Sequence, residues 1–457
     1  MTEIRPGERI GVLGLARSGV AASRLALKQG AEVYASDLSR NEATEAAAVQ
    51  LRALGADVDT GVHDLEKLAA CSRIVLSPGI PLTAKILSAP GIAGIPVVPE
   101  IEFAFHELSA PVVTVTGTNG KTTVTALIAH LLRTAGIDAE AGGNIGVALS
   151  ELALREPQPA VAVVEASSFQ LGATTDFACS VGVLTNLAPD HLDWYGSVEE
   201  YYADKAKMYR GASPRSRWVL NGEDEEALAL PGDAPGERYV VRIESPLEPG
   251  ERGGYLSADG WLTLRPDSEN HRILASSELK IRGPHNVANA LFAALAAYLV
   301  GAPIDRLAEG LRSFSPIPHR LEPVAEKNGV LWINDSKATN IASTLVAIRG
   351  MDRPTVLLLG GRHKGEPYRK LIPRMEGRVK QVIAYGEAAD QVVADLGGAI
   401  PVEKVEGRFE VVLARAAAHA ESGDTVLLSP ACSSYDMFES YEHRGREFRR
   451  IVEEELG

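Results

Sequence analysis

The sequence predicts an α/β protein with three domains, each built around a mainly parallel sheet. Strand-like and helix-like patterns alternate along most of the chain, which is typical of parallel sheets covered by helices. At 457 residues the chain is too long for one ordinary hydrophobic core, and the length suggests about three domains. Proline-containing segments divide it, so we expect domains over residues 1–98, 99–315 and 316–457.

The composition argues against several classes of protein. The formal net charge is -14 and no basic run offsets it, so we expect no nucleic-acid partner. No stretch offers the roughly 18 uninterrupted apolar residues of a membrane span. The charged segment 1–9 runs directly into a strand pattern, unlike a secretory signal. Cys71, Cys179 and Cys432 are widely scattered, which indicates reduced core thiols in a cytoplasmic protein, and we expect a monomer.

The first domain opens with a strand pattern over residues 9–14 and a helix pattern over residues 19–30. A second strand pattern ends at Asp37, about twenty positions after the first glycines, as in the opening of a Rossmann-type domain. The glycines Gly14 and Gly19 do not complete the G-x-G-x-x-G pattern. The segment therefore indicates a nucleotide diphosphate near the first helix without specifying NAD.

A second candidate ligand turn follows the strand pattern of residues 74–76. It reads Ser-Pro-Gly-Ile, and its candidate contacts are Ser77 and Gly79. Because parallel strands present their carboxyl ends to a ligand crevice, a nucleotide could lie here. A purely structural turn explains the same residues equally well.

The second domain contains the most informative segment, residues 114–123, which reads T-V-T-G-T-N-G-K-T-T. A β-branched run meets a glycine-rich turn, and a helix pattern then opens with Lys121. Backbone N–H groups at Gly117 and Gly120 would point at an anion, the helix start adds its positive end, and Thr122 can bind Mg²⁺. The first glycine of G-x-x-x-x-G-K-[ST] is replaced by valine, so we interpret the segment as a shortened phosphate-binding loop. The alternative is a strand-to-helix turn with an exposed lysine.

Two further strand patterns of this domain end near residues that suit a metal site. The apolar run 160–164 leads to Glu165, which is expected to hold Mg²⁺ opposite Lys121. The strand pattern 181–185 leads to a loop with His191. That histidine is either a second metal ligand, a phosphate contact, or a capping or surface residue.

Three candidates lie on helix patterns. Nothing in the helix pattern 198–209 distinguishes Lys205 from an exposed helix lysine. Asn286 and Asn289 are three positions apart, so they share a helix face from which they could bind a base. Capping and helix packing are the alternative roles for both asparagines.

The rest of the chain completes the architecture. Residues 222–278 are rich in proline, glycine and charge, and we expect a β-rich excursion within the middle domain. The third domain begins with the strand pattern 330–333 and then alternates strands and helices. If the ligands are anions, positive charge must gather locally despite the acidic total. The candidates are Lys121, Arg320, Lys337 and Lys364.

Taken in order, these motifs resemble the Mur ligase family, the ATP-dependent amino-acid ligases of peptidoglycan precursor synthesis. The resemblance covers nearly the whole chain. The matching segments are residues 116–123, 165–168, 190–191, 205, 285–289, 319–320 and 335–340. Segments 360–365 and 429–438 favour a member that adds D-glutamate, and the Asp-Asn-Pro-Arg signature of the diaminopimelate-adding relative is absent.

The resemblance implies addition of D-glutamate to UDP-N-acetylmuramoyl-L-alanine through an acyl phosphate, with ATP and Mg²⁺ at two sites. It assigns catalysis to Lys121, Glu165, His191 and Lys205. It assigns metal binding to Thr122, Glu165, His191 and carbamoylated Lys205. Carbamoylation would turn this lysine cation into a carboxylate, and Mg²⁺ prefers such oxygen ligands.

The same resemblance distributes the substrates over the three domains. It assigns ATP to Gly117, Thr118, Asn119, Gly120, Lys121, Thr122, Thr123, Asn286, Asn289, Arg320 and Asp335. It assigns the uridine substrate to Gly14, Leu15, Ala16, Asp37, Ser77, Gly79 and Asn144. It assigns D-glutamate to Lys337, Thr339, Lys364, Ser434 and Tyr441. The last of these is a tyrosine where the family pattern has phenylalanine.

Three other functions remain open from the sequence. One is a ligase of the same family that adds a different amino acid or acts on folate. Another is a phosphate-loop NTPase whose hydrolysis drives motion or partner binding. The third is a nucleotide-binding module without catalytic activity.

Overall fold

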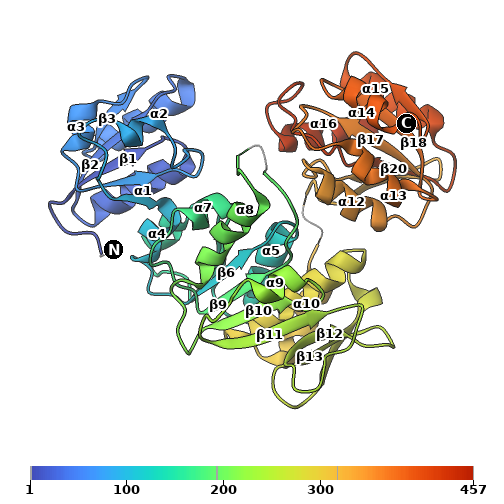
Figure 1. Ribbon diagram of the computed structural model, residues 1–457, viewed down its shortest axis with the longest axis horizontal. Helices are drawn as coiled ribbons and strands as arrows, with labels where there is room; N and C mark the ends of the chain where they lie inside the picture. Colours follow the sequence, from blue (N-terminus) through green and yellow to red (C-terminus); the bar gives the residue numbers. More distant parts are fainter. Residues whose placement is uncertain (1–2, 192–193, 316–317, 456–457) are drawn as a thin grey trace. The chain divides into compact units, whose positions relative to one another are not determined.

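The computed structural model describes residues 3–191, 194–315 and 318–455, and it contains three sheets flanked by helices (Figure 1). The expected three-domain α/β architecture is thereby confirmed. The expected boundary between residues 315 and 316 cannot be followed in the structure, because residues 316–317 lie outside the described residues.

Contacts along the chain group these sheets into two compact units. The first unit is Met1–Pro189, Ser197–Glu278 and Ala288–Arg312, and the second is Asp190–Gly196, Leu279–Val287 and Ser313–Gly457. The first two sheets therefore belong to one unit, and the third sheet belongs to the other. The three domain ranges expected from the sequence stay predictions.

The first sheet has five parallel strands in the order β3-β2-β1-β4-β5. Its strands are β1 (Arg9–Leu13), β2 (Glu32–Asp37), β3 (Asp57–Thr60), β4 (Arg73–Leu76) and β5 (Val97–Pro99). Its helices are α1 (Arg17–Lys28), α2 (Glu42–Ala53), α3 (Leu65–Ala69), the 3₁₀ turn η1 (Lys85–Ser88) and α4 (Glu100–Phe105). The strand order reverses at β1, and ligands of such sheets bind where the carboxyl ends diverge.

The second sheet has nine strands in the order β14-β13-β12-β11-β10-β9-β6-β8-β7. Strands β6 (Val112–Thr116), β7 (Ala139–Gly143), β8 (Val161–Glu165), β9 (Val181–Leu184), β10 (Arg217–Asn221), β11 (Glu237–Arg242) and β12 (Gly253–Leu256) pair in parallel. Strands β13 (Trp261–Arg265) and β14 (His271–Ala275) add an antiparallel edge. The β-rich excursion expected over residues 222–278 thus continues the sheet of the middle domain.

The helices of this domain include the one that carries Lys205. They are α5 (Lys121–Thr134), α6 (Leu149–Leu154), α7 (Ser168–Gly172), α8 (Val198–Ala206), α9 (Glu225–Ala229), α10 (Pro284–Leu299) and α11 (Leu307–Ser313), with 3₁₀ turns η2 (Lys207–Tyr209), η3 (Ser276–Glu278) and η4 (Ile304–Arg306). Ser197 caps the start of helix α8, because its hydroxyl oxygen accepts a hydrogen bond from the Glu200 amide. Glu199 and Glu200 lie in the first turn, where their negative charges interact favourably with the positive end of the helix dipole.

The third sheet has six strands in the order β15-β16-β20-β17-β18-β19. Its strands are β15 (Glu322–Lys327), β16 (Val330–Asn334), β17 (Thr355–Gly360), β18 (Val379–Tyr385), β19 (Val402–Lys404) and β20 (Thr425–Leu428), and only β15 runs antiparallel to its neighbour. Its helices are α12 (Ile341–Arg349), η5 (Tyr368–Leu371), α13 (Ile372–Met375), α14 (Ala389–Leu396), α15 (Phe409–His419) and α16 (Tyr441–Glu454).

Both faces of this third sheet are buried. Successive side chains of a strand point to opposite faces, and β17 follows this rule: Leu357 and Leu359 join one apolar cluster, whereas Val356 and Leu358 join the other. Each such side chain contributes about 1.5–3 kcal/mol when fully buried. The strands are therefore held firmly, and their carboxyl ends provide fixed positions for the loops that follow.

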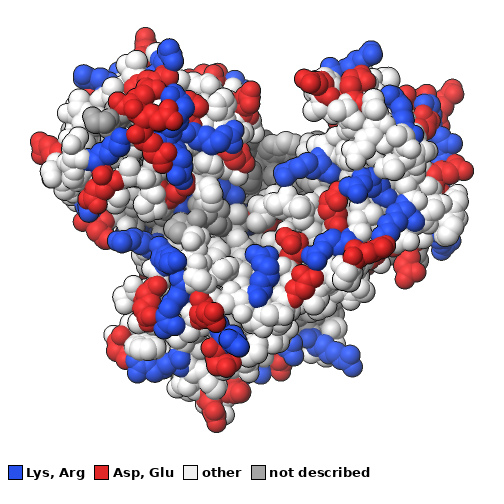
Figure 2. Space-filling model, turned by 180° about the vertical axis from the view of Figure 1, so that it is seen from behind, with Lys and Arg blue, Asp and Glu red and all other residues white. Residues whose placement is uncertain are grey.

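The surface carries both signs of charge. Figure 2 shows lysine and arginine side chains interspersed with acidic ones on the face in view. Within the described residues, no helix is long and apolar enough to cross a membrane.

Candidate functional site

The phosphate-binding loop predicted from the sequence joins β6 to α5. Gly117 and Gly120 have φ values of +138° and +85°, which a residue with a side chain rarely adopts. A Cβ atom at Gly117 would lie 2.1 Å from the Thr185 hydroxyl oxygen, and one at Gly120 would lie 2.6 Å from Asn289 Oδ1. Both glycines are therefore required by backbone conformation and by close packing.

The strand beside the loop also supports its backbone. The amides of Thr118 and Asn119 donate to the carbonyl and side-chain oxygens of Asn186, each at 2.9 Å. The Thr185 hydroxyl donates to the Asn119 carbonyl at 2.6 Å. No motif in the sequence assigned a role to Thr185 or Asn186, although their place directly after a strand pattern was the available signal. They hold the loop in shape.

Two lysines converge on this loop. Lys121 Nζ donates to the carbonyls of Gly117 and Thr118 at 3.0 and 2.8 Å, so this lysine is not simply exposed. Lys205 Nζ donates to the same Gly117 carbonyl at 2.9 Å and lies 4.5 Å from the centre of the Tyr201 ring. Lys205 is 1% exposed, so the interpretation as an exposed helix lysine was wrong. Helix α8 thus places the ammonium group of Lys205 beside the phosphate loop.

A buried carboxylate ends the neighbouring strand. Glu165, at the end of β8, pairs with Val115 of β6 and is 2% exposed. Its Oε1 accepts a hydrogen bond of 2.8 Å from Asn144 Nδ2, and its Oε2 has no hydrogen-bond partner among the described residues. A buried carboxylate oxygen without a partner is costly. The free oxygen therefore suits a cation such as Mg²⁺.

The two asparagines at the start of α10 make different contacts. Asn289, 6% exposed, packs its amide oxygen against Gly120, and this places it at the phosphate loop. Asn286 Nδ2 donates to the Arg282 carbonyl at 2.8 Å, one turn earlier in the chain.

His191 belongs to the second compact unit. Its φ is +55° and its Nε2 lies 3.7 Å from Asp190 Oδ2. Asp190 Oδ2 also accepts a hydrogen bond of 2.8 Å from Asn340 Nδ2. Asn340 caps α12, since its side chain accepts from the Ser343 amide. The structure thus groups His191 with Asp190 and with the start of α12.

In the first domain, the residues expected to bind the uridine substrate cluster where the strand order reverses. Asp37 Oδ2 accepts from the Leu15 amide at 2.8 Å, and its Oδ1 accepts from the Ser39 amide at 2.7 Å. Ser77 is buried and donates weakly to the Gly14 carbonyl at 3.4 Å. Two more expected contacts lie in the same turns, namely Ala16, which caps α1, and exposed Gly79.

The residues expected to bind D-glutamate follow neighbouring strands of the third sheet. Lys337, Lys364 and Ser434 lie in the loops after β16, β17 and β20 respectively. Lys337 Nζ lies 5.6 Å from the centre of the Tyr441 ring. Thr339 is half-buried, and its amide donates to the Lys337 carbonyl at 2.9 Å. Positive side chains and short polar ones thus gather at one edge of the sheet.

Asp335 follows β16 and is buried. Its Oδ2 accepts a hydrogen bond of 2.8 Å from the Ser429 hydroxyl, and its Oδ1 accepts one of 3.2 Å from the Leu321 amide. Burial raises the pKa of Asp335 from 3.8 to about 7, although the charges of Arg320 and Arg444 oppose the rise. The Nε of Arg320 is buried and has no hydrogen-bond partner among the residues described.

This raised pKa predicts a pH-dependent stability. The folded state binds the proton of Asp335 more tightly than the unfolded state does. Its contribution is therefore complete below about pH 4 and is lost as the pH rises towards about 7. Asp335→Asn removes this dependence, so wild-type stability relative to the variant should fall over that window, by at most about 1.4 kcal/mol per pH unit.

Thermal unfolding of wild type and variant at several pH values measures this difference in stability. Asp352→Asn, at an exposed loop position, is the control, and parallel profiles for wild type and Asp335→Asn would contradict the assignment.

Comparison with known proteins identifies similar sequences over the whole length. Three family models match in order: "Mur ligase MurD-like, N-terminal domain" over residues 8–99, "Mur ligase middle domain" over 115–297, and "Mur ligase, glutamate ligase domain" over 319–432. The UDP-N-acetylmuramoylalanine--D-glutamate ligase of Salinibacter ruber is 40% identical over 451 residues, which cover 97% of each chain. The protein of the same name from Anaeromyxobacter dehalogenans is 42% identical over 464 residues, which cover 98% of each chain.

Solved structures share the fold at lower identity. A pseudomurein peptide ligase type C from Methanothermus fervidus superposes with a TM-score of 0.63 at 21% identity, covering 98% of this chain and 100% of that one. Escherichia coli FolC in complex with DHPP and ADP gives 0.58 at 17% identity, covering 77% and 92%. These structures share the fold, the first over nearly the whole chain and the second over about three quarters of it.

Proposed function

The chain belongs to the Mur ligase family, and we propose how its residues divide the work of that family's reaction. It is an ATP-dependent ligase that adds D-glutamate to UDP-N-acetylmuramoyl-L-alanine in peptidoglycan precursor synthesis. The observation that carries the proposed site is the convergence of two lysines on the Gly117 carbonyl, at the same sheet edge as the buried Glu165 carboxylate.

We assign the first step to this edge of the second sheet. The substrate carboxylate attacks the γ-phosphorus of ATP, so that an acyl phosphate forms and ADP leaves. Two anions have to meet, and catalysis therefore consists mainly of charge neutralisation and alignment. Lys121, the loop amides and the start of α5 bind the phosphates.

The magnesium sites follow from the donor atoms. Thr122 and Glu165 would hold one ion, which fits the unpartnered Glu165 Oε2. Carbamoylated Lys205 would be a ligand of a second ion, and we assign His191 as a further metal ligand. When bound, Mg²⁺ supplies neutralisation of phosphate charge.

The second step belongs to the third sheet. The amine of D-glutamate attacks the acyl carbon, an amide bond forms, and inorganic phosphate leaves. Lys337 and Lys364 carry positive charge that complements the two carboxylates of this substrate. Arg320 and Asp335 contact ATP, and the turns at Gly14 and Ser77 contact the uridine nucleotide.

We also propose that the protein is a cytoplasmic monomer. All three cysteines are buried and free, as expected in a reducing compartment. Cell fractionation tests the compartment, and light scattering of the purified chain tests the oligomeric state.

Phosphate release against a panel of amino acids tests this function. With UDP-N-acetylmuramoyl-L-alanine, ATP and Mg²⁺, we expect D-glutamate to exceed L-glutamate and D-aspartate by about 10²-fold or more in kcat/KM. Omitting the uridine substrate should stop phosphate release, whereas an NTPase that drives motion would continue. With ¹⁸O in the substrate carboxylate, one labelled oxygen should appear in the released phosphate. Its absence would contradict the acyl phosphate.

A further inference from the structure

Arg444, in the first turn of α16, is fully buried. Its exposed fraction is 0%, which is unusual for an arginine. Nε donates to the Ser336 hydroxyl oxygen at 2.9 Å, and Nη2 donates to the carbonyls of Ser336 and Cys432 at 2.8 and 3.1 Å. Nη1 donates to the Gly360 carbonyl at 3.4 Å. All four acceptors are uncharged oxygen atoms.

These acceptors come from three neighbouring strands of the third sheet. Gly360 ends β17, Ser336 follows β16, and Cys432 follows β20, which lies between the other two. Each acceptor lies a few positions before a residue assigned to D-glutamate. Ser336 precedes Lys337, Gly360 precedes Lys364, and Cys432 precedes Ser434. One guanidinium thus fixes the spacing of three loops that carry the amino-acid site.

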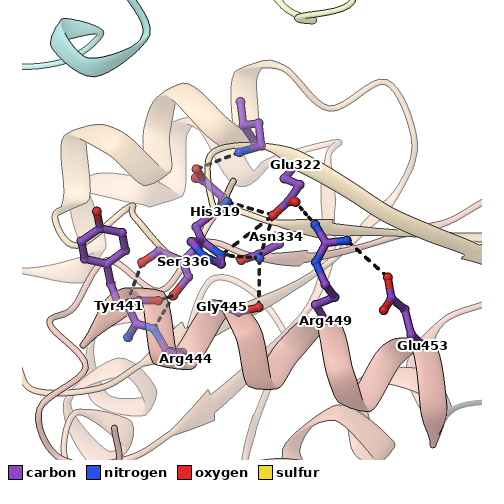
Figure 3. A network of polar contacts seen from close by, with 11 residues as sticks. His319, Glu322, Asn334, Ser336, Tyr441, Arg444, Gly445, Arg449 and Glu453 are labelled. Carbon is purple, nitrogen blue, oxygen red and sulfur yellow. Dashed lines mark hydrogen bonds and ion pairs between the residues drawn. The ribbon is translucent and has the colours of Figure 1, made fainter. Parts of the chain in front are cut away.

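The same group is linked to a fourth assigned residue. The Ser336 hydroxyl accepts from Arg444 and donates to the Tyr441 carbonyl at 2.9 Å, as Figure 3 shows. Tyr441 begins the helix that carries Arg444. The start of α16 is therefore tied to the loop after β16.

Only an arginine fits this arrangement. Its planar fork offers five donors in fixed directions, whereas a lysine ammonium is a compact point charge. The approach to the loop is close, because a Cβ at Gly361 would lie 3.2 Å from Arg444 Nη1 and 2.2 Å from the Ser433 carbonyl. Burying a charge against uncharged partners is costly.

We propose that Arg444 is a positioning residue for the amino-acid substrate: it holds the loops after β16, β17 and β20 at the separation that a dicarboxylate amino acid needs. This inference rests on the proposed D-glutamate site. The guanidinium acts through the loops and does not itself touch the substrate.

Steady-state kinetics of Arg444→Lys test this role. We expect KM for D-glutamate to rise about tenfold or more, because the lysine keeps the charge but cannot hold three loops. KM for the uridine substrate should stay within about twofold, since most of its assigned contacts lie on the first sheet, far along the chain from the loops that Arg444 holds. Arg450→Lys is the matched control: this arginine lies on the same helix, is half-buried and pairs with Glu447 and Glu455, so the change should leave the KM values unchanged.

The outcomes separate this role from a merely structural one. A lower melting temperature with reduced kcat and an unchanged KM for D-glutamate would overturn the proposal. If Arg444→Lys is not recovered folded, Ser336→Ala decides, because it removes only the Nε acceptor and the link to Tyr441. It should raise KM for D-glutamate by about threefold or more, and no rise would overturn the proposal. If wild type shows no D-glutamate-dependent turnover, the proposed function fails instead.

Discussion

Lys121→Ala is expected to lower ATP-dependent phosphate release by on the order of 10²–10³-fold or more, while leaving the fold intact. Lys121 Nζ lies over the carbonyls of Gly117 and Thr118, at the positive end of α5. In the first step a carboxylate must approach a triphosphate, so two anions repel each other unless a fixed cation is present. Alanine removes that cation, and because alanine favours helices it does not disturb α5.

A coupled assay for ADP and a second assay for phosphate measure this effect. Circular dichroism and the melting temperature should match those of wild type. Lys28→Ala is a suitable control, because Lys28 is exposed on α1 and contacts the Glu156 carboxylate and the Leu154 carbonyl. Turnover within about threefold of wild type for Lys121→Ala would dispose of the assignment of residues 114–123 as the phosphate loop.

The phosphate loop was predictable from the sequence because its physics is local. Gly117 and Gly120 are needed for positive φ within a few residues of a strand end, and Lys121 opens a helix that follows at once. The same holds for Glu165, since an apolar run that ends in a carboxylate places it at the ligand edge of a parallel sheet. The alternation of strands and helices likewise predicted the three mainly parallel sheets.

The rest of the site depends on contacts between distant segments. Lys205 reaches a carbonyl 88 positions earlier, so its local sequence resembles that of any helix lysine. Thr185 and Asn186 support the loop only because β9 lies beside β6. Arg444 holds loops 84 and 108 positions away, and no local pattern around it signals this role. Such residues become visible only when the strand order is known.

Lys205→Ala is expected to reduce turnover by at least about 10²-fold through loss of a metal ligand. The ε-amine is held at the phosphate loop. An ammonium there would repel the Mg²⁺ of the proposed site. In the proposed modification, carbon dioxide would react with the amine of Lys205 to form an N–C bond, with release of one proton and formation of a carboxylate.

Carbon-13 NMR of protein kept in ¹³C-bicarbonate tests the modification directly. Wild type should show a carbamate signal that Lys205→Ala lacks. Lys207→Ala is the matched control, because this lysine lies two positions further on, is half-buried and donates to the Gly172 carbonyl. It should retain the signal. Removing bicarbonate should lower wild-type turnover and leave the residual rate of Lys205→Ala unchanged, since the variant has no amine at residue 205 to carbamoylate. Full activity of Lys205→Ala, or no carbamate signal in wild type, would contradict a carbamoylated metal ligand.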